Sequence, residues 1–196
     1  MDAGTRRHLP RLGQQFYQGA AYVHWTLNIE RRVTGWLTPR FFEDWKLVLL
    51  HTCCRYRLIV PVFTLMPDHV HLLAIGRSDG GDQRRAIEFL QKNLRTSLGS
   101  ANWQRQSFDH VLREHEREKG ALSSLASYIL QNPVRARLVA APADYGYTGA
   151  CIPGYPEIDV LHPDYWPVFW RIYNRDGETG HSLTLAATKS LGAATG

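Results

Sequence analysis

The chain has 196 residues, a length that suits one domain with a substantial hydrophobic core. Its formal net charge of +5 has the sign expected of a phosphate-binding protein, although many other proteins share it. No apolar run approaches the roughly 18 residues that a membrane span needs, and no apolar stretch follows the basic residues near the N-terminus. The three cysteines lack C-x-x-C spacing, which disfavours a zinc knuckle or a disulfide framework. We therefore predict a cytoplasmic protein without a membrane segment.

Composition divides the chain into three parts. Residues 1–19 are predicted to be a flexible basic arm, and residues 20–175 to form the folded domain. From residue 176 to 196 the sequence is dominated by Gly, Ala, Ser and Thr, a composition that cannot bury enough apolar surface to fold. We predict that this tail is disordered.

The first expected elements are a strand and a helix. Apolar and polar residues alternate from 21 to 29, which predicts a half-buried strand. Thr38 followed by Pro39 is typical of a helix start. Apolar residues then recur near helical spacing, so we expect a helix over 39–54.

Two further strands are expected directly after this helix. The apolar run 56–66 predicts a strand in which Pro61 indicates an edge position or a bulge. A turn at Pro67 and Asp68 leads at once into the apolar segment 69–75. The two strands should therefore form a tight antiparallel hairpin.

The remaining predicted elements are a helix, a short strand and a second, short helix. Asp82 is a candidate N-cap for a helix over 82–98, and a short strand is plausible over 108–113. Apolar residues over 122–130 predict a short helix that Pro133 must end. The order β-α-β-β-α-β, with one more helix, predicts an α+β fold, a ferredoxin-like sandwich with an antiparallel sheet and helices packed on one face.

His69 and His71 are the first candidate site residues. They lie two apart on a predicted strand, so both imidazoles point to the same face, about 7 Å apart along the chain. Two neutral imidazoles at that spacing can share one metal ion. A pair of partly buried, hydrogen-bonded histidines explains the same pattern.

Tyr128 is the second candidate. It falls on the flank of the apolar stripe of the helix that ends at Pro133, where its hydroxyl can reach solvent. A tyrosine at the rim of the core is the ordinary alternative. Asn132, before the proline, is equally typical of a helix terminator.

Two longer strings make the sequence recognisable. Leu65-Met66-Pro67-Asp68-His69-Val70-His71-Leu72-Leu73 resembles the HUH motif, two histidines around a hydrophobic residue, of REP-associated tyrosine transposases. Tyr128-Ile129-Leu130-Gln131-Asn132-Pro133-Val134-Arg135-Ala136 resembles the segment that carries that family's nucleophile. The similarity spans roughly residues 20 to 139.

The resemblance implies a function and roles for these residues. Tyr128 would cut single-stranded or hairpin DNA and rejoin it through a 5′-phosphotyrosine link. His69 and His71 would hold Mg²⁺ or Mn²⁺. The third metal ligand would lie one helical turn after the tyrosine, which indicates Asn132, with Gln131 as the alternative.

Basic side chains are candidates for binding the DNA, although each is more often only a solvated surface charge. They are Arg84, Arg85, Lys92, Arg95, Arg113 and Arg135. The expected partner is single-stranded or hairpin DNA, bound by a monomer or a homodimer. Two other hypotheses remain: a DNA-binding module without catalysis, and a metal-dependent phosphodiesterase that uses water in place of Tyr128.

Overall fold

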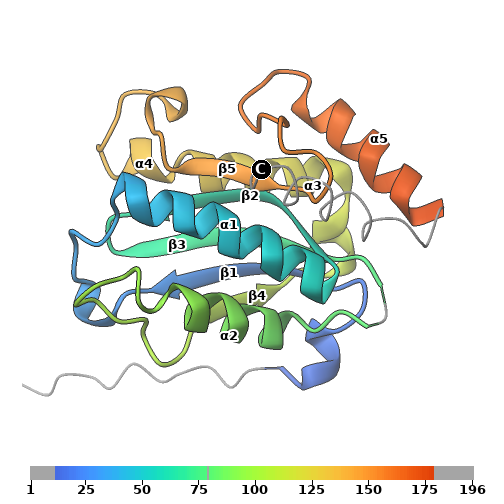
Figure 1. The fold of residues 1–196 in the computed structure, drawn as a ribbon. Coiled ribbons are helices and arrows are strands. Elements are labelled where there is room, and N and C mark those ends of the chain that lie inside the picture. The colour runs from blue at the N-terminus through green and yellow to red at the C-terminus, as the bar shows by residue number, and fades with distance from the viewer. Residues whose placement is uncertain (1–11, 79, 179–196) are drawn as a thin grey trace, which may run out of the picture.

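A five-stranded antiparallel sheet forms the centre of the computed structural model, which describes residues 12–78 and 80–178 (Figure 1). The strand order is β4-β1-β3-β2-β5. The strands are β1 (Tyr22–Asn28), β2 (Leu58–Met66), β3 (His69–Gly76), β4 (Phe108–Val111) and β5 (Thr148–Cys151). The first four follow the predicted β-α-β-β-α-β order, and β5 extends the sheet beside β2. The predicted α+β fold class is confirmed.

Helices cover both faces of the sheet. The α-helices are α1 (Pro39–Tyr56), α2 (Gln83–Leu94), α3 (Lys119–Leu130), α4 (Asn132–Arg135) and α5 (Tyr165–Glu178), and the 3₁₀ turns are η1 (Gln14–Tyr17), η2 (Glu30–Arg32), η3 (Glu114–Arg117) and η4 (Pro142–Asp144). In Figure 1, α1 and α2 lie in front of the sheet and α3 lies behind it. None of the helices in the described ranges is long and apolar enough to cross a membrane.

The alternation of β3 explains the two layers. Val70, Leu72 and Ala74 belong to the core cluster with α1 and α2, whereas Leu73 and Ile75 belong to the cluster with α3 and α5. The expectation of helices on one face therefore holds for α1 and α2 and must be corrected for α3 and α5. Strands buried on both faces lack polar alternation, which is how β2 appears in the sequence.

Local sequence signals set several boundaries. The Thr38 side chain accepts a hydrogen bond from the Phe41 amide at the start of α1, and Asp82 does the same for Arg85 at the start of α2. The register of β2 shifts across Pro61 in its pairing with β3 and again in its pairing with β5, so the proline lies at a bulge. The alternative of an edge position was wrong, because β2 pairs with both β3 and β5.

The predicted ends of the domain need correction. Part of the predicted arm is ordered, since residues 14–17 form η1, and Tyr17 is fully buried and lies 5.7 Å from Trp25, ring centre to ring centre. The part of the predicted arm over residues 1–11 lies outside the described residues. At the other end, α5 continues to Glu178, so residues 176–178 are helical in place of the predicted disorder. The rest of the predicted tail, 179–196, lies outside the described residues.

Candidate active site

His69 and His71 lie at the start of β3, the central strand of the sheet. The antiparallel register places Thr26 of β1 opposite His71 and Asn28 opposite His69. Because side chains alternate along a strand, the two histidines share the face of Leu73 and Ile75, the face covered by α3 and α5. The hairpin turn at Asp68 brings this polar end of the face into reach of solvent, and the His69 side chain is 15% exposed.

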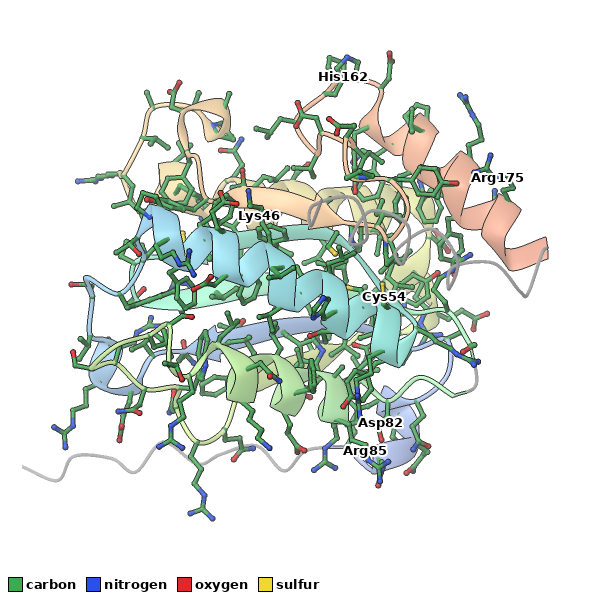
Figure 2. All side chains as sticks on the ribbon, in the orientation of Figure 1. Lys46, Cys54, Asp82, Arg85, His162 and Arg175 are labelled. Atoms are coloured by element: carbon green, nitrogen blue, oxygen red, sulfur yellow. The ribbon has the colours of Figure 1, made fainter. Side chains whose placement is uncertain are left out.

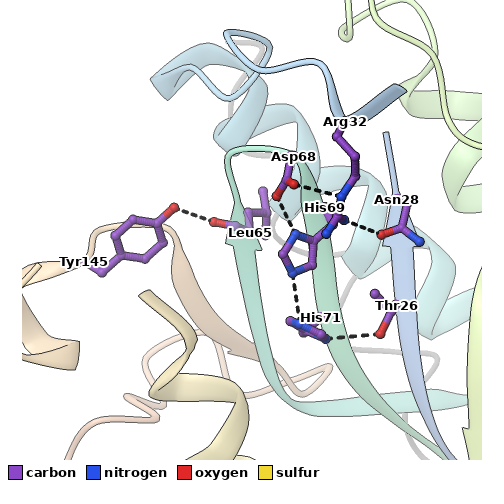
Figure 3. Close-up of polar contacts among 8 residues, drawn as sticks. All are labelled: Thr26, Asn28, Arg32, Leu65, Asp68, His69, His71 and Tyr145. Carbon is purple, nitrogen blue, oxygen red and sulfur yellow. Dashed lines mark hydrogen bonds and ion pairs between the residues drawn. The ribbon is translucent and has the colours of Figure 1, made fainter. Parts of the chain in front are cut away.

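The Nε2 atoms of the two imidazole rings lie 3.0 Å apart (Figure 3). Two ligand atoms that are each about 2.1 Å from one ion, at adjacent coordination positions, are separated by about 3 Å. The pair therefore has the spacing that a shared metal ion requires. The donor chemistry also fits, because neutral imidazole nitrogen binds first-row divalent metals.

Each histidine is held through its other ring nitrogen. His69 Nδ1 lies 2.6 Å from Asp68 Oδ1, and a carboxylate can only accept, so Nδ1 carries the proton and Nε2 keeps its lone pair. His71 Nδ1 lies 3.2 Å from Thr26 Oγ1 and 3.2 Å from His24 Nε2. Metal ligands are commonly oriented in this way, by a hydrogen bond at the nitrogen that does not face the ion.

Burial keeps both imidazoles neutral. It lowers the pKa of His71 to about 3, with further lowering from neighbouring His69 and His24 and then from Arg32 and Arg135. Burial also lowers the pKa of His69, although the Asp68 carboxylate partly opposes this. Near neutral pH each side chain is therefore a neutral imidazole, the charge state in which histidine can bind a metal.

Tyr128 reaches the histidines from α3, on the layer that covers them. Its ring centre lies 6.4 Å from that of His71, in an edge-to-face arrangement, and the side chain is 43% exposed. Leu122, Ala126 and Ile129 anchor the helix by their burial in the core. The structure thus brings together the tyrosine and the histidine pair, which are far apart in the sequence.

Asn132 follows one turn later, at the start of α4. Its Nδ2 donates to the carbonyl oxygens of Tyr128 and Ile129, at 3.0 and 3.2 Å, so the side chain caps the end of α3. The carboxamide oxygen is the atom that a metal would use. No hydrogen bond between Asn132 and either histidine is present in residues 12–78 and 80–178, and Gln131 is exposed. The same ranges contain no group of three or more His, Cys, Asp or Glu side chains placed to hold a metal.

The candidate DNA-binding residues divide between the two layers. The Arg135 guanidinium lies 4.6 Å from the centre of the Tyr128 ring, beside the histidines. Arg84, Arg85, Lys92 and Arg95 belong to α2 or its end, across the sheet from Tyr128. Figure 2 labels Arg85 beside the N-cap Asp82 at the start of that helix. Arg113 is exposed after β4, and its amide donates to Glu116.

Sequence reasoning missed the residues that hold the histidines. Asp68 was visible as the neighbour of His69, and Thr26 and His24 as polar positions of the first strand. What the sequence did not show was the pairing of that strand with β3, in the register that places Thr26 beside His71.

The fold and the site define a class: a ferredoxin-like sandwich with a histidine pair on an inner strand and a helical tyrosine against it. No family model matches the chain. The chain is 23% identical over 150 residues to a protein of Haemophilus influenzae that bears the name REP-associated tyrosine transposase, a match that covers 69% of this chain and 82% of the relative.

A solved structure shares the fold. It is a REP-associated tyrosine transposase bound to a REP hairpin, with a TM-score of 0.60 and 16% sequence identity, covering 71% of this chain and 82% of that one. The resemblance to these transposases, first indicated by two strings of the sequence, is thus confirmed by both comparisons.

Proposed function

We propose that the protein cleaves and rejoins single-stranded or hairpin DNA, with Tyr128 as the nucleophile. The observation that carries this proposal is the position of Tyr128, half exposed and 6.4 Å from His71 between ring centres. The similarity to transposases, one of them bound to a DNA hairpin, supports the choice of substrate.

The chemistry is a transfer of one phosphodiester bond. The Tyr128 oxygen attacks the phosphorus, the bond from phosphorus to the 3′ oxygen breaks, and the phenol proton passes to solvent while the leaving oxygen takes one up. The product is a 5′-phosphotyrosine and a free 3′-hydroxyl. Because the new ester replaces the old one, a second 3′-hydroxyl can reverse the step and join strands without ATP.

Residues of the site would assist in two ways. His69 and His71 would hold a divalent cation, with the oxygen of Asn132 as a further ligand and Gln131 as the alternative. When bound, the cation would offset charge on the non-bridging phosphate oxygens. Two imidazole donors favour Mn²⁺ over Mg²⁺. The Arg135 guanidinium would contact the phosphate next to the tyrosine that it covers.

The arrangement also favours a site in which one chain supplies both the tyrosine and the histidines. Tyr128 meets the histidines of its own chain, so we propose that it acts on the site of the same subunit, whether the protein is a monomer or a homodimer. Arg113 and the basic residues of the α2 layer remain candidates for contacts with a longer DNA strand.

The test is the covalent adduct. Protein mixed with labelled single-stranded hairpin DNA and Mn²⁺ should give a band that survives boiling in detergent, with protein attached to the 5′ phosphate of the cut strand. Tyr128→Phe removes one oxygen from a side chain at the rim of the core, so it should bind DNA but form no adduct. Denaturing gels measure both results.

Tyr147→Phe is the matched control. Tyr147 packs against Phe42 in the α1 layer, so the same change there should leave the adduct intact. An adduct with Tyr128→Phe would contradict our assignment. A binding module would form no adduct in either form, and a water-using phosphodiesterase would cut equally well with phenylalanine.

A further inference from the structure

We infer that Asp68 is a positioning residue for His69, and that Arg32 holds Asp68 in the orientation this needs. The inference rests on the proposed function in one respect, the role of His69 as a metal ligand. The site residues that the sequence motifs indicated do not include Asp68 or Arg32, and neither was predicted to act in the chemistry.

The contacts form a chain of three polar steps (Figure 3). His69 Nδ1 is 2.6 Å from Asp68 Oδ1, and the second carboxylate oxygen is 3.0 Å from Arg32 Nε. Arg32 Nη1 in turn donates to Asn28 Oδ1 at 2.7 Å. The backbone supports the same arrangement, since the Ile29 amide donates to the Asp68 carbonyl at 3.0 Å. Three separate segments, β1, η2 and the β2–β3 turn, are therefore joined through the Asp68–Arg32 ion pair.

The backbone at Arg32 is unusual. Arg31 and Arg32 have φ angles of 56° and 58°, a left-handed region that side chains other than glycine rarely adopt. Such a conformation persists only when surrounding interactions hold it. For Arg32 these interactions are the bonds to Asp68 and Asn28. The chain bends back at this point in a way that places a guanidinium on the carboxylate behind His69.

This network has a consequence for the His69 imidazole. With Nδ1 donating to Asp68, the lone pair of Nε2 is directed at His71 Nε2, 3.0 Å away. The carboxylate also makes that nitrogen a stronger donor to a metal. Without Asp68, the ring can rotate and the proton can move to Nε2, which would block the coordinating atom. A merely structural role for Asp68 would stabilise the turn without changing the ring.

Metal affinity provides the first measurement. Titration calorimetry with Mn²⁺ should show affinity weakened about 10- to 100-fold by Asp68→Ala. Asp68→Asn should lose less, because its oxygen can still accept from His69 although its nitrogen cannot accept from Arg32. His71→Ala, which removes a ligand, sets the scale for a damaged site.

Two matched controls separate this role from a general loss of charge. Asp44 on α1 is 24% exposed against 26% for Asp68, and it likewise binds an arginine, Arg40. Asp44→Ala should leave Mn²⁺ affinity unchanged. Arg32→Ala should weaken it by less than Asp68→Ala, and Arg31→Ala, with the same charge and backbone region, should not weaken it.

The tautomer of His69 is a second readout that needs no metal. Long-range ¹H–¹⁵N spectra should show the proton on Nδ1 in the wild type, and a loss of this preference in Asp68→Ala but not in Asp44→Ala. An unchanged tautomer in Asp68→Ala would overturn the inference. Wild-type Mn²⁺ affinity in Asp68→Ala would also overturn it, provided that His71→Ala does weaken Mn²⁺ binding. If His71→Ala binds Mn²⁺ as well as the wild type, the metal site itself fails, and the role of Asp68 as a positioner of a metal ligand fails with it. Thermal unfolding of each variant shows whether it is folded.

Discussion

His71 is held differently from His69, and the difference sets a requirement for metal binding. Because His69 Nε2 keeps a lone pair, the neighbouring Nε2 of His71 carries a proton when no metal is bound, and its Nδ1 accepts from Thr26. To bind a cation through both Nε2 atoms, His71 must move that proton to Nδ1. The Thr26 hydroxyl can donate or accept, so it can serve both forms.

We expect His71→Ala and His69→Ala to abolish metal-dependent DNA cleavage, since each removes one of two nitrogen ligands. Loss should exceed about 100-fold, as is usual when a group that acts on the transition state is removed. Gel-based cleavage rates in Mn²⁺ measure it. His51→Ala on the exposed surface of α1 is the control and should cleave normally. Full cleavage by either site variant would make the pair structural.

At the residue scale, sequence reasoning indicated the candidate site residues but not the residues that support them. Spacing placed His69 and His71 on one face, and helical position made Tyr128 accessible, as the structure shows. Whether Asn132 binds metal stays a prediction. The partners Asp68, Thr26 and Arg32 depend on strand register and on a left-handed turn, and no local pattern of residues fixes either of them.

The α2 helix shows how an element can carry charge without facing the site. Its apolar residues Ala86, Ile87, Leu90 and Leu94 pack in the cluster with α1, so its basic side chains lie on the far layer from Tyr128. Arg84 covers the Tyr17 ring at 5.9 Å, and Arg85 approaches Asp82 at 3.8 Å. These contacts give two of the four basic residues a local structural role.

DNA binding should therefore depend more on Arg135 than on α2. Arg135→Ala should weaken hairpin binding and reduce the slope of log affinity against log salt by about 0.7, the value for one contact to a single-stranded phosphate. A triple change of Arg84, Lys92 and Arg95 to Ala should leave the slope nearly unchanged. Binding isotherms at several salt concentrations decide between them. The reverse pattern would show that DNA crosses the α2 layer.

The strand β5 and the helix α5 escaped sequence reasoning for different reasons. The four-residue strand β5 has no apolar alternation and contains Gly149. The helix α5 carried a usable signal, because Trp166, Phe169 and Tyr173 recur at spacings of three and four residues. The prolines nearby and the aromatic composition obscured it, although Pro167 is compatible with the first turn of a helix.

Across the whole molecule, buried histidines link stability to pH. The pKa is lowered to about 3 in His71 and to about 4 in His24, mainly by burial. The unfolded chain, where a histidine has a pKa near 6.5, therefore binds more protons at acidic pH. The contribution of these neutral histidines to the free energy of unfolding is fully present above about pH 6.5. It is lost as the pH falls toward their pKa values in the folded protein.

Lowering the pH from 7 to 5 should reduce the free energy of unfolding by about 1–2 kcal/mol for each of these two histidines. Urea denaturation in the presence of a chelator measures it. His24→Gln should flatten the dependence by removing one such group. A stability that is constant over this range would mean that the imidazoles are not buried as described.

The short strand β5 has a role that neither the site nor the core requires. It pairs with β2, whose nine residues are all buried, and so occupies a row of backbone groups that could otherwise recruit the same strand of another molecule. Resistance to aggregation would then depend on one of the smallest elements of the fold. A side chain at Gly149 would place its Cβ 2.8 Å from the Phe63 ring, whereas at Gly146 no atom beyond the neighbouring residues of the chain lies within 4 Å. In Gly149→Val, light scattering should therefore increase with protein concentration more than in the wild type. In Gly146→Val it should stay at the wild-type level. Equal scattering by the two variants would show that pairing with β5 does not protect β2 from aggregation.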